Sequence, residues 1–294
     1  MILVIGGTGT VGSELVRELL ARSQHVKVLT RSQEKVKELP AGVEGVVGDL
    51  LEPETIRTVF RGVRAVYMSN ASSPSEAHEG LHAVEGARKA GVDRFVYQSV
   101  FGAEEPYIPI IAAKTIIESA LRTSRIPHVI LRPNNFFQND YWYQEALLRF
   151  SVYPQPLGNV GVSRVDVRDI AEAAAIALTN PAYDGLTCNL VGPQSLTTQD
   201  VATMWGSALG KPIGCGADNL DEWEASVRQF MPALTAYDLR LLFDIFHERG
   251  FKGSESDIKR QRDLLGREPR DFQSFARDTA SAWSTPRARE EARA

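Results

Sequence analysis

The sequence contains little cysteine, no long apolar run and no excess of positive charge. Its 294 residues include two cysteines, Cys188 and Cys215, too few for a disulfide framework or a four-cysteine zinc site, and we expect no metal. No apolar run reaches the roughly 18 residues that a membrane helix requires. Lys and Arg number 33 and Asp and Glu 37, a net charge of −4, which argues against nucleic acid as a partner.

No basic region followed by a long apolar stretch is visible at the start of the sequence, so we expect a cytoplasmic protein without a membrane partner. Apolar residues make up 43% of the chain and charged residues 24%, which is typical of a folded globular protein and excludes general disorder. For the oligomeric state, we expect either a monomer or a homodimer.

The first half of the sequence alternates short apolar runs with amphipathic stretches of helical length, which predicts parallel strands joined by helices. The predicted strands are 2–5, 26–29, 44–48, 64–68, 94–99 and 128–132, and the predicted helices are 11–22, 53–61, 76–90 and 107–123. Strands this apolar belong to a sheet that is covered on both faces. We therefore expect an α/β fold with a doubly wound, mainly parallel sheet.

The second half has a different character. Residues 151–163 are rich in Pro and Gly, and they suggest a boundary between a first domain, 1–150, and a smaller, mixed and mostly helical lobe, 151–294. A helix at 169–179 and a strand at 187–191 are predicted within this lobe, which is expected to bind the substrate as a lid and to return some of its elements to the sheet. Thr197 or Thr198 is expected to cap the next helix, and the charged segment 287–294 to be a solvated tail.

A glycine-rich loop directly follows the first predicted strand and opens the first helix. In this context the free amides of a helix N-terminus form an anion site suited to a pyrophosphate. Gly6 would permit the tight turn, Gly9 would let the phosphates approach the backbone, and Gly12 would let the helix pack closely. The predicted cofactor contacts of the loop are Gly6, Thr8, Gly9, Thr10, Val11 and Gly12.

The end of the second strand indicates which nucleotide is bound. An acidic residue about 20 residues after the glycines would favour NAD, but the end of the second strand, residues 29–32, contains no carboxylate, and the next one is Glu34. Arg31, with the hydroxyls of Thr30 and Ser32, would instead accept a 2′-phosphate. We therefore favour NADP(H), with NAD(H) possible, and a solvent-exposed arginine without a ligand is the alternative.

Two further strand ends are expected to contact the cofactor. Asp49 would accept the adenine amino group while Leu50 covers a face of the ring, although Asp49 could instead cap the helix that begins near residue 53. Asn70 and Ala71 follow the fourth strand, where the middle of the cofactor would cross the edge of the sheet.

Several motifs occur together in an order that resembles one family. They are residues 6–12, Thr30-Arg31, Gly48-Asp49, Tyr97-Gln98-Ser99, Lys114 and Arg132-Pro133-Asn134. The chain resembles, over roughly residues 1–210, the NmrA-like branch of the atypical short-chain dehydrogenases/reductases. The resemblance implies an NAD(P)-binding Rossmann domain, with Pro133 and Asn134 near the cofactor. It also implies either reduction of quinones and aromatic compounds or a redox-sensing regulator without turnover.

One departure from the wider superfamily concerns its catalytic tyrosine, which lies four residues before the catalytic lysine. Lys114 is present, but Ile110 occupies the tyrosine position. The resemblance implies that Lys114 binds the nicotinamide ribose; alternatively it extends outward or pairs with Glu118. Ser99 would bond a substrate carbonyl or satisfy its own turn, and Tyr107 is a weak candidate for a replacement acid.

Five aromatic residues fall within 136–143, directly after the sixth strand. Ligands bind at this edge of parallel sheets, in pockets lined by aromatic side chains. We interpret the segment as one wall of a pocket for a flat, largely apolar substrate, and a core cluster is the alternative. The predicted substrate contacts are Phe101, Ile110, Asn135, Phe136, Phe137 and Trp142.

These features favour an oxidoreductase that transfers hydride from NAD(P)H to a quinone, an enone or an aromatic or polycyclic ketone. Its partner would then be a small aromatic or quinone-like molecule. A non-catalytic NADP(H) sensor that binds a partner protein is the alternative, because Ile110 replaces the phenol. An accessory reductase in aromatic natural-product biosynthesis is a further possibility.

Overall fold

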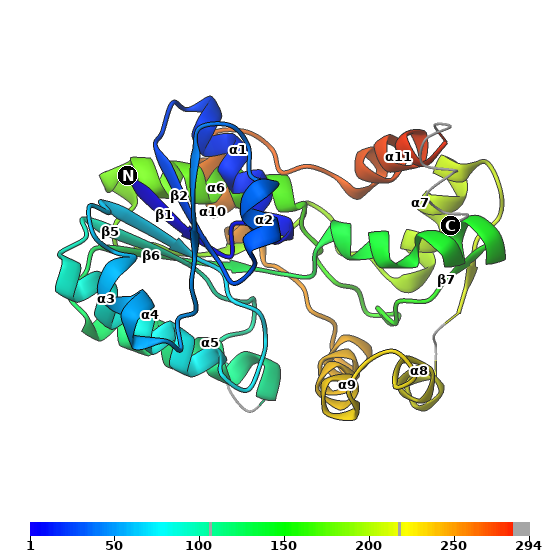
Figure 1. Ribbon diagram of the computed structural model, residues 1–294. Helices are drawn as coiled ribbons and strands as arrows, with labels where there is room; N and C mark the ends of the chain where they lie inside the picture. Colours follow the sequence, from blue (N-terminus) through cyan, green and yellow to red (C-terminus); the bar gives the residue numbers. More distant parts are fainter. Residues whose placement is uncertain (106–107, 217–218, 285–294) are drawn as a thin grey trace. The chain divides into compact units, whose positions relative to one another are not determined.

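The structure is a computed structural model, and it describes residues 1–105, 108–216 and 219–284 (Figure 1). Two compact units are present. Unit 1 comprises Met1–Pro133, Val167–Leu190 and Asp263–Gly266, and unit 2 comprises Asn134–Asp166, Val191–Arg262 and Arg267–Ala294.

Unit 1 is built on a seven-stranded sheet in which every neighbouring pair is parallel. The strands are β1 (Ile2–Ile5), β2 (Val26–Thr30), β3 (Val43–Val47), β4 (Ala65–Met68), β5 (Arg94–Gln98), β6 (His128–Pro133) and β8 (Thr187–Leu190). Their order is β3-β2-β1-β4-β5-β6-β8. The chain therefore winds in one direction from β1 and in the other from β4, which creates a topological switch point between these two strands.

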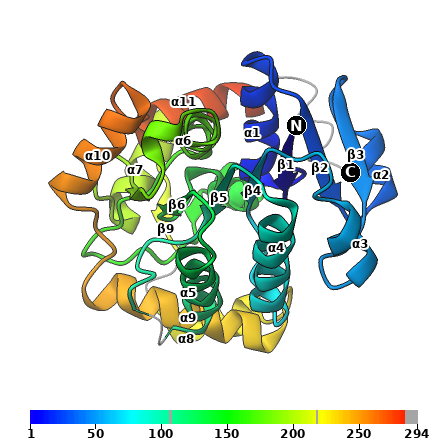
Figure 2. The same cartoon turned by 90° about the vertical axis from the view of Figure 1, so that its left-hand side faces the viewer.

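Helices cover both faces of this sheet. They are α1 (Thr10–Ala21), α2 (Gln33–Lys37), α3 (Pro53–Thr58), α4 (Glu76–Ala90), α5 (Pro109–Thr123) and α6 (Val167–Thr179), with a 3-10 turn η3 (Pro181–Tyr183) before β8. Helix α1 packs beside α6 on one face, and α4 packs beside α3 and α5 on the other (Figure 2). This coverage explains why every residue of the central strands β1, β4 and β5 is buried.

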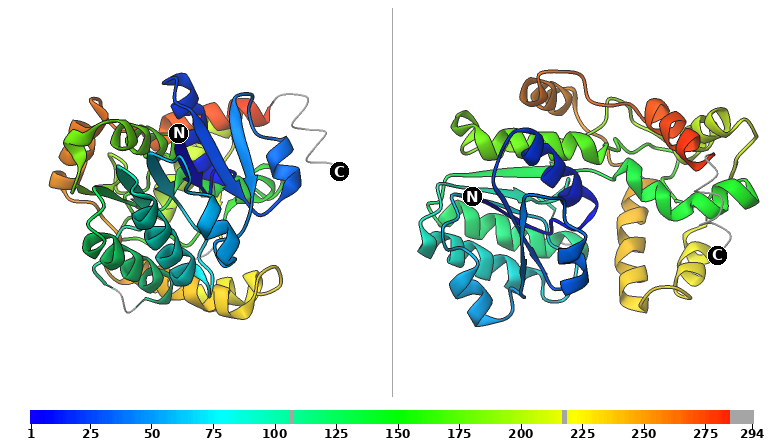
Figure 3. Two further views of the ribbon diagram at one scale, coloured as in Figure 1. Left: turned by 60° about the vertical axis from the view of Figure 1, so that its left-hand side comes forward. Right: turned by 45° about the horizontal axis from the view of Figure 1, so that its top comes forward.

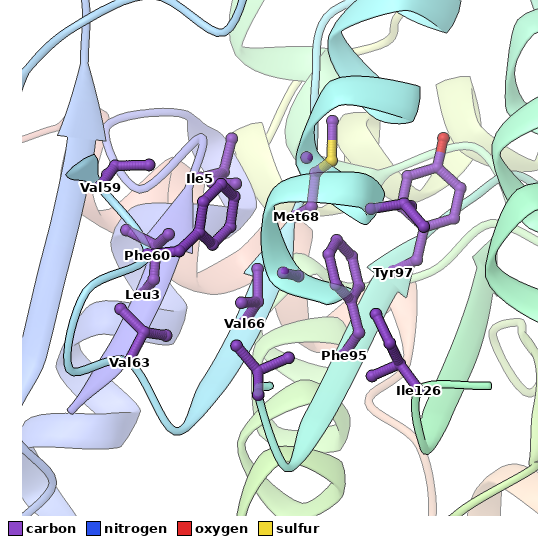
Figure 4. Close-up of a cluster of buried hydrophobic side chains, with 14 of the residues drawn as sticks. Leu3, Ile5, Val59, Phe60, Val63, Val66, Met68, Phe95, Tyr97 and Ile126 are labelled. Atoms are coloured by element: carbon purple, nitrogen blue, oxygen red, sulfur yellow. The ribbon is translucent and has the colours of Figure 1, made fainter. Parts of the chain in front are cut away.

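The core beneath α4 and α5 follows the period of two expected of strands. Figure 4 shows alternate residues of three neighbouring strands pointing to the same side, namely Leu3, Ile5, Val66, Met68, Phe95 and Tyr97. Buried residues of the two helices, including Ala83, Ile117 and Leu121, belong to the same cluster. The cluster joins α4 and α5 to the sheet that they cover.

Unit 2 is mostly helical. Its elements are the 3-10 helix η1 (Phe137–Tyr143), the π-helical turn η2 (Ala146–Phe150), β7 (Val152–Tyr153), α7 (Thr198–Leu209), β9 (Gly214–Cys215), α8 (Leu220–Val227), α9 (Ala233–Glu248), α11 (Phe272–Trp283) and most of α10 (Glu255–Leu265). Helix α11 packs against α7 (Figure 3), and α8 against α9. Of the two predicted caps, Thr197 is the N-cap of α7, in a capping box with Asp200.

The expected fold class is confirmed, since the doubly wound parallel sheet carries helices on both faces. The compact units differ from a simple division at residue 150, because residues 134–150 belong to unit 2 while α6 and β8 return to unit 1. Helix α2 was not predicted, because its five residues contain a single apolar one, Val36, and so show no apolar repeat. None of the helices in the described ranges could cross a membrane.

Candidate functional site

The carboxyl ends of the strands bring several predicted site residues to one edge of unit 1. The register aligns Ile5 of β1 with Leu29 of β2 and with Met68 of β4, and β5 continues the same edge. The segments that begin with Gly6, Arg31, Ser69 and Ser99 therefore all leave the sheet at this edge. The loops after β1 and β4 flank the switch point, which is where ligands bind in open α/β sheets.

Two glycines of the loop after β1 are required by the backbone itself. Gly6 has a φ of +83°, and a Cβ there would lie 2.1 Å from the carbonyl oxygen of Ser69. A Cβ on Gly12 would lie 2.1 Å from the carbonyl oxygen of Gly6. At Gly9 the nearest atom would be the Gly6 oxygen at 3.3 Å, so this position is less constrained by the protein and remains open to an approaching ligand.

The start of α1 provides backbone donors for an anion. Gly9 is its N-cap without a side-chain hydrogen bond, and the first turn contains no acidic residue. Ser13 donates the first helical hydrogen bond, to Gly9 O at 2.9 Å, so the amides of Thr10, Val11 and Gly12 have no carbonyl acceptor within the helix. Thr8 is half-buried, Thr10 exposed and Val11 buried. This cradle fits a pyrophosphate, because donors and a helix dipole converge where no carboxylate of the first turn opposes them.

The end of β2 presents an exposed cation. Arg31 is exposed, and across the described ranges no carboxylate lies within ion-pair distance of its guanidinium. The hydroxyl of Ser32 donates to Glu34 Oε2 at 3.0 Å and accepts from Lys35 N, which makes Ser32 the N-cap of α2. Thr30 Oγ1 accepts from Ser32 N. A backbone hydrogen bond, followed by the Ser32 hydroxyl, lowers the pKa of Glu34. Ser32 is thus engaged locally, whereas Arg31 is free to meet a phosphate.

The segment after β3 has a local structural role in addition to the role predicted for it. Asp49 Oδ1 accepts from Leu51 N at 2.9 Å, which closes the turn before α3, whereas the N-cap of α3 is Glu52. The alternative that Asp49 caps this helix is therefore wrong. Leu50 is buried within the core cluster of unit 1. The adenine contacts assigned to Asp49 and Leu50 stay predictions.

The segment after β4 joins the sheet edge to α4. Asn70 Nδ2 donates to the carbonyl oxygen of Glu76 at 2.9 Å, while Asn70 Oδ1 is buried without a hydrogen-bond partner among the described residues. Ala71 is exposed. An orphaned acceptor at the switch point is compatible with the predicted cofactor contact.

Lys114 pairs with a carboxylate that the sequence did not single out. Its Nζ donates to Glu76 Oε1 at 2.6 Å, and the side chains of Lys114 and Glu76 are 12% and 2% exposed. The predicted alternative, a pair with Glu118 one turn along α5, is wrong. Glu76 could have been suspected from the sequence, because α4 and α5 both start after strands that end at this edge.

Glu118 is instead enclosed by other donors. Ser99 Oγ donates to Glu118 Oε1 at 2.6 Å. Arg132 binds both carboxylate oxygens at 2.9 and 2.8 Å, and Arg122 donates to Oε2 at 2.8 Å. Burial would raise the pKa of Glu118, but the hydrogen bonds from Arg132 and Ser99 outweigh it and lower the pKa. The Ser99 hydroxyl is therefore neither free nor satisfied by its own turn.

The two buried carboxylates differ in their electrostatics. Burial raises the pKa of Glu76, and the charge and hydrogen bond of Lys114 offset this only in part. Burial also raises the pKa of Tyr97 well above its usual range, and the negative charges of Glu76 and Glu118 add to the effect. Within the described part of the chain, the buried Tyr97 hydroxyl has no hydrogen-bond partner.

The predicted substrate contacts, and the predicted cofactor contacts Pro133 and Asn134, are divided between the two units. In unit 1, Phe101 and Pro133 are buried and Ile110 is half-buried on α5. In unit 2, the side chain of Asn134 donates to Phe251 O at 2.8 Å and accepts from Asn135 N. Phe136 is half-buried and Trp142 is 79% exposed. The ligand contacts assigned to these residues stay predictions. Tyr107 and the segment 287–294 lie outside the described residues.

Phe137 lies in the core of unit 2. It is 1% exposed, and its ring lies 5.1 Å from that of Phe272 and 5.5 Å from that of Phe275. Fully buried Arg164 donates to Asp140 Oδ1 at 2.7 Å and lies over the Phe272 ring. For Phe137 the structure therefore favours the core alternative over a pocket wall.

Comparisons with known proteins agree with the geometry of unit 1. The model of a family described as NAD(P)H-binding matches residues 6–181. An NAD(P)H azoreductase from Xenophilus azovorans is 32% identical over 96% of this chain and 99% of its own length. Among solved structures, the triphenylmethane reductase of a Citrobacter species, complexed with NADP(H), has a TM-score of 0.83 at 24% identity over 95% of this chain and all of that one. NmrA, a negative transcriptional regulator in complex with NADP, has a TM-score of 0.80 at 18% identity over 97% of this chain and 98% of its own.

The family match covers more than half of the chain, and the azoreductase matches nearly all of it. The likeness to the two solved structures supports the shared fold. The azoreductase uses NAD(P)H, which agrees with the cofactor class expected from the NmrA-like resemblance. The chain therefore belongs to the NAD(P)H-binding family.

Proposed function

We propose that this protein is a reductase that uses NADPH in preference to NADH to reduce a flat aromatic acceptor, such as a quinone or an azo dye. The observation that carries the proposal is the cradle at residues 6–12, which lies at the switch point of a chain similar along its length to an azoreductase. The triphenylmethane reductase, whose solved structure is a complex with NADP(H), has a name that also points to an aromatic acceptor.

The backbone of residues 6–12 would hold the pyrophosphate, and Arg31 would hold the 2′-phosphate of NADPH. Lys114 has three N–H donors, and the Glu76 carboxylate accepts one of them, which leaves two for ribose hydroxyls. When bound, the reduced nicotinamide supplies a hydride. The chain's contribution would be chiefly orientation of this cofactor beside the acceptor, which can account for much of a rate enhancement.

Of these two acceptors, the absence of a tyrosine at position 110 favours the quinone, because its reduced form is a weak base. A hydroquinone anion takes its proton from solvent, so a fixed phenol is unnecessary. Ser99 could assist at the acceptor oxygen only by giving up its hydrogen bond to Glu118, and hydrogen bonds to charged groups contribute about 1.5–3 kcal/mol. We therefore assign the principal role to Lys114.

The test is NADPH consumption, followed by absorbance, with a panel of azo dyes, triphenylmethane dyes and 1,4-quinones. We expect saturable oxidation with at least one member of the panel. Oxidation no faster than the protein-free background with every acceptor would refute the reductase.

Replacement of Arg31 by Ala tests the cofactor preference. Loss of one charge-assisted hydrogen bond is expected to weaken NADPH binding roughly 10- to 100-fold, while NADH binding changes little. Lys35→Ala, which removes a nearby exposed cation, is the control. Equal losses for both cofactors in Arg31→Ala would contradict recognition of the 2′-phosphate.

A non-catalytic NADP(H) sensor is the second candidate, and Ile110 at the usual tyrosine position is the observation that favours it. This candidate predicts tight binding of NADP(H) without turnover, together with a partner protein whose binding depends on the nucleotide. The acceptor panel therefore separates the two candidates, since turnover at any member excludes the sensor.

A further inference from the structure

Glu76 is a buried acid outside every motif of the sequence. It is the first residue of α4, where the helix dipole favours a negative charge, yet burial raises its pKa. A buried carboxylate is costly unless it is paired, and its side-chain partner is the ammonium of Lys114. A group held at such a cost suggests a role beyond stability.

The packing of α4 against α5 is built to allow this pair. Gly80 lies one turn after Glu76, and a Cβ at Gly80 would lie 2.3 Å from Cδ1 and Cγ1 of fully buried Ile117. Ile117 lies one turn after Lys114, so the same faces of the helices carry both contacts. A glycine inside a helix costs roughly 1 kcal/mol relative to alanine, and here it lets the helices approach where the ion pair forms.

The neighbouring carboxylates have hydrogen-bond donors of their own, so Lys114 pairs with Glu76. Glu118 on α5 is saturated by Arg132, Arg122 and Ser99. Tyr97 of β5 is the other titratable group that is electrostatically coupled to Glu76 from the sheet, and Glu79 on α4 adds a like charge. Glu79 itself accepts from Ser75 Oγ.

The contacts of Glu76 also reach the glycine loop. Asn70 Nδ2 binds the Glu76 carbonyl oxygen, and Asn70 follows Ser69, whose carbonyl oxygen faces the Cα of Gly6 so closely that no Cβ would fit. A continuous path therefore links the loop after β1, the loop after β4 and the start of α4 to Lys114.

We propose that Glu76 is a positioning residue: its buried carboxylate anchors the Lys114 ammonium at the carboxyl edge of the sheet, so that the two remaining N–H donors meet the nucleotide. This inference rests on the nucleotide binding proposed above. It assigns Glu76 no contact with the cofactor, and its effect on binding passes entirely through Lys114.

The experiment is a double-mutant cycle of Glu76→Gln and Lys114→Met, with the dissociation constant of NADPH measured by fluorescence titration and folding followed by circular dichroism. Glu79→Gln is the matched control, since it removes the same charge from the same helix without touching Lys114. We expect about 10-fold weaker binding for E76Q, a similar loss for K114M, no further loss in the double variant, and a change below twofold for E79Q.

The outcomes separate this inference from the proposed function. Wild-type protein that fails to bind NADPH refutes the proposed function. Wild-type binding with an unaffected E76Q, or losses that add in the double variant, refutes only the role of Glu76. If E76Q does not fold, Glu76→Asp decides, because it keeps the charge but shortens the reach: about threefold weaker binding at an unchanged melting temperature supports the proposal, and an unchanged dissociation constant overturns it.

Discussion

The carboxyl edge of the sheet in unit 1, where we propose that the nucleotide binds, and the aromatic core of unit 2 are organised in opposite ways. The edge uses consecutive residues, 6–12, whose backbone amides form the candidate phosphate site. The core of unit 2 instead gathers Phe137, Asp140, Arg164, Trp205 and Phe272 from distant segments. A function carried by local backbone can be recognised in sequence, whereas aromatic residues that cluster in sequence need not share a role.

The largest effect is expected in unit 2, where Arg164→Met would leave the buried carboxylate of Asp140 without its cation. Removing one partner of a buried ion pair costs about 3–5 kcal/mol, and the free energy of unfolding from denaturant titration measures this loss. Arg149→Met is the control, since the Arg149–Glu145 pair is 65% exposed on both sides and should contribute at most about 1 kcal/mol. Equal losses of unfolding free energy in the two variants would contradict the expected difference between the buried and the exposed ion pair.

Two glycine variants test whether the loop after β1 binds the phosphates of the nucleotide. Gly12→Ala places a Cβ 2.1 Å from Gly6 O, so the loop must shift. Loss of two charge-assisted hydrogen bonds would weaken NADPH binding by roughly 100-fold or more and also lower the melting temperature. Gly9→Ala meets its nearest atom at 3.3 Å, so it should fold normally and lose affinity only. Normal affinity in Gly9→Ala, measured by the same titration, would refute close approach of phosphate at this position.

Glu118→Gln is expected to have an intermediate, pH-dependent effect. The pKa of Glu118 is lowered in the folded protein, despite burial, by Arg132 and Ser99. Its ionised form therefore stabilises the fold above the unfolded pKa of about 4.3, and this contribution is lost as the pH falls through the folded pKa. The variant should lose about 2–3 kcal/mol at pH 7, and the gap to the wild type should narrow below pH 4. A gap independent of pH in denaturant titrations would contradict this assignment.

The smallest effect on stability is expected for Trp142→Ala, because its side chain is 79% exposed. The change should be within about 0.5 kcal/mol, against about 3–5 kcal/mol for Phe137→Ala. If Trp142 binds the acceptor, as the sequence predicts, the KM for an aromatic acceptor should rise in the variant at an unchanged NADPH affinity. An unchanged KM would remove Trp142 from the predicted substrate contacts.

The sheet and the glycine loop could be predicted because each depends on a pattern of residues that are close together in the sequence. Apolar runs of strand length alternate with helical stripes, and Gly6, Gly9 and Gly12 follow the first run directly. Helix α2 was not predicted, because a single apolar residue in a five-residue helix gives no apolar repeat. The partner of Lys114 was not predicted for another reason. Glu118 is one helical turn away in sequence, but Arg132 from β6 already binds both of its carboxylate oxygens.

The doubly wound fold and the glycine loop after the first strand follow from the sequence alone, as does the position of Arg31, on which the predicted preference for NADP(H) rests. These follow from periodicity and from glycines whose conformational freedom is needed locally. Three pairings required the folded structure: Glu76 holds Lys114, Ser99 donates to Glu118, and Phe137 lies in a core with Arg164. Such pairings depend on which helices and strands become neighbours, and burial then makes each unpaired charge too costly to leave alone.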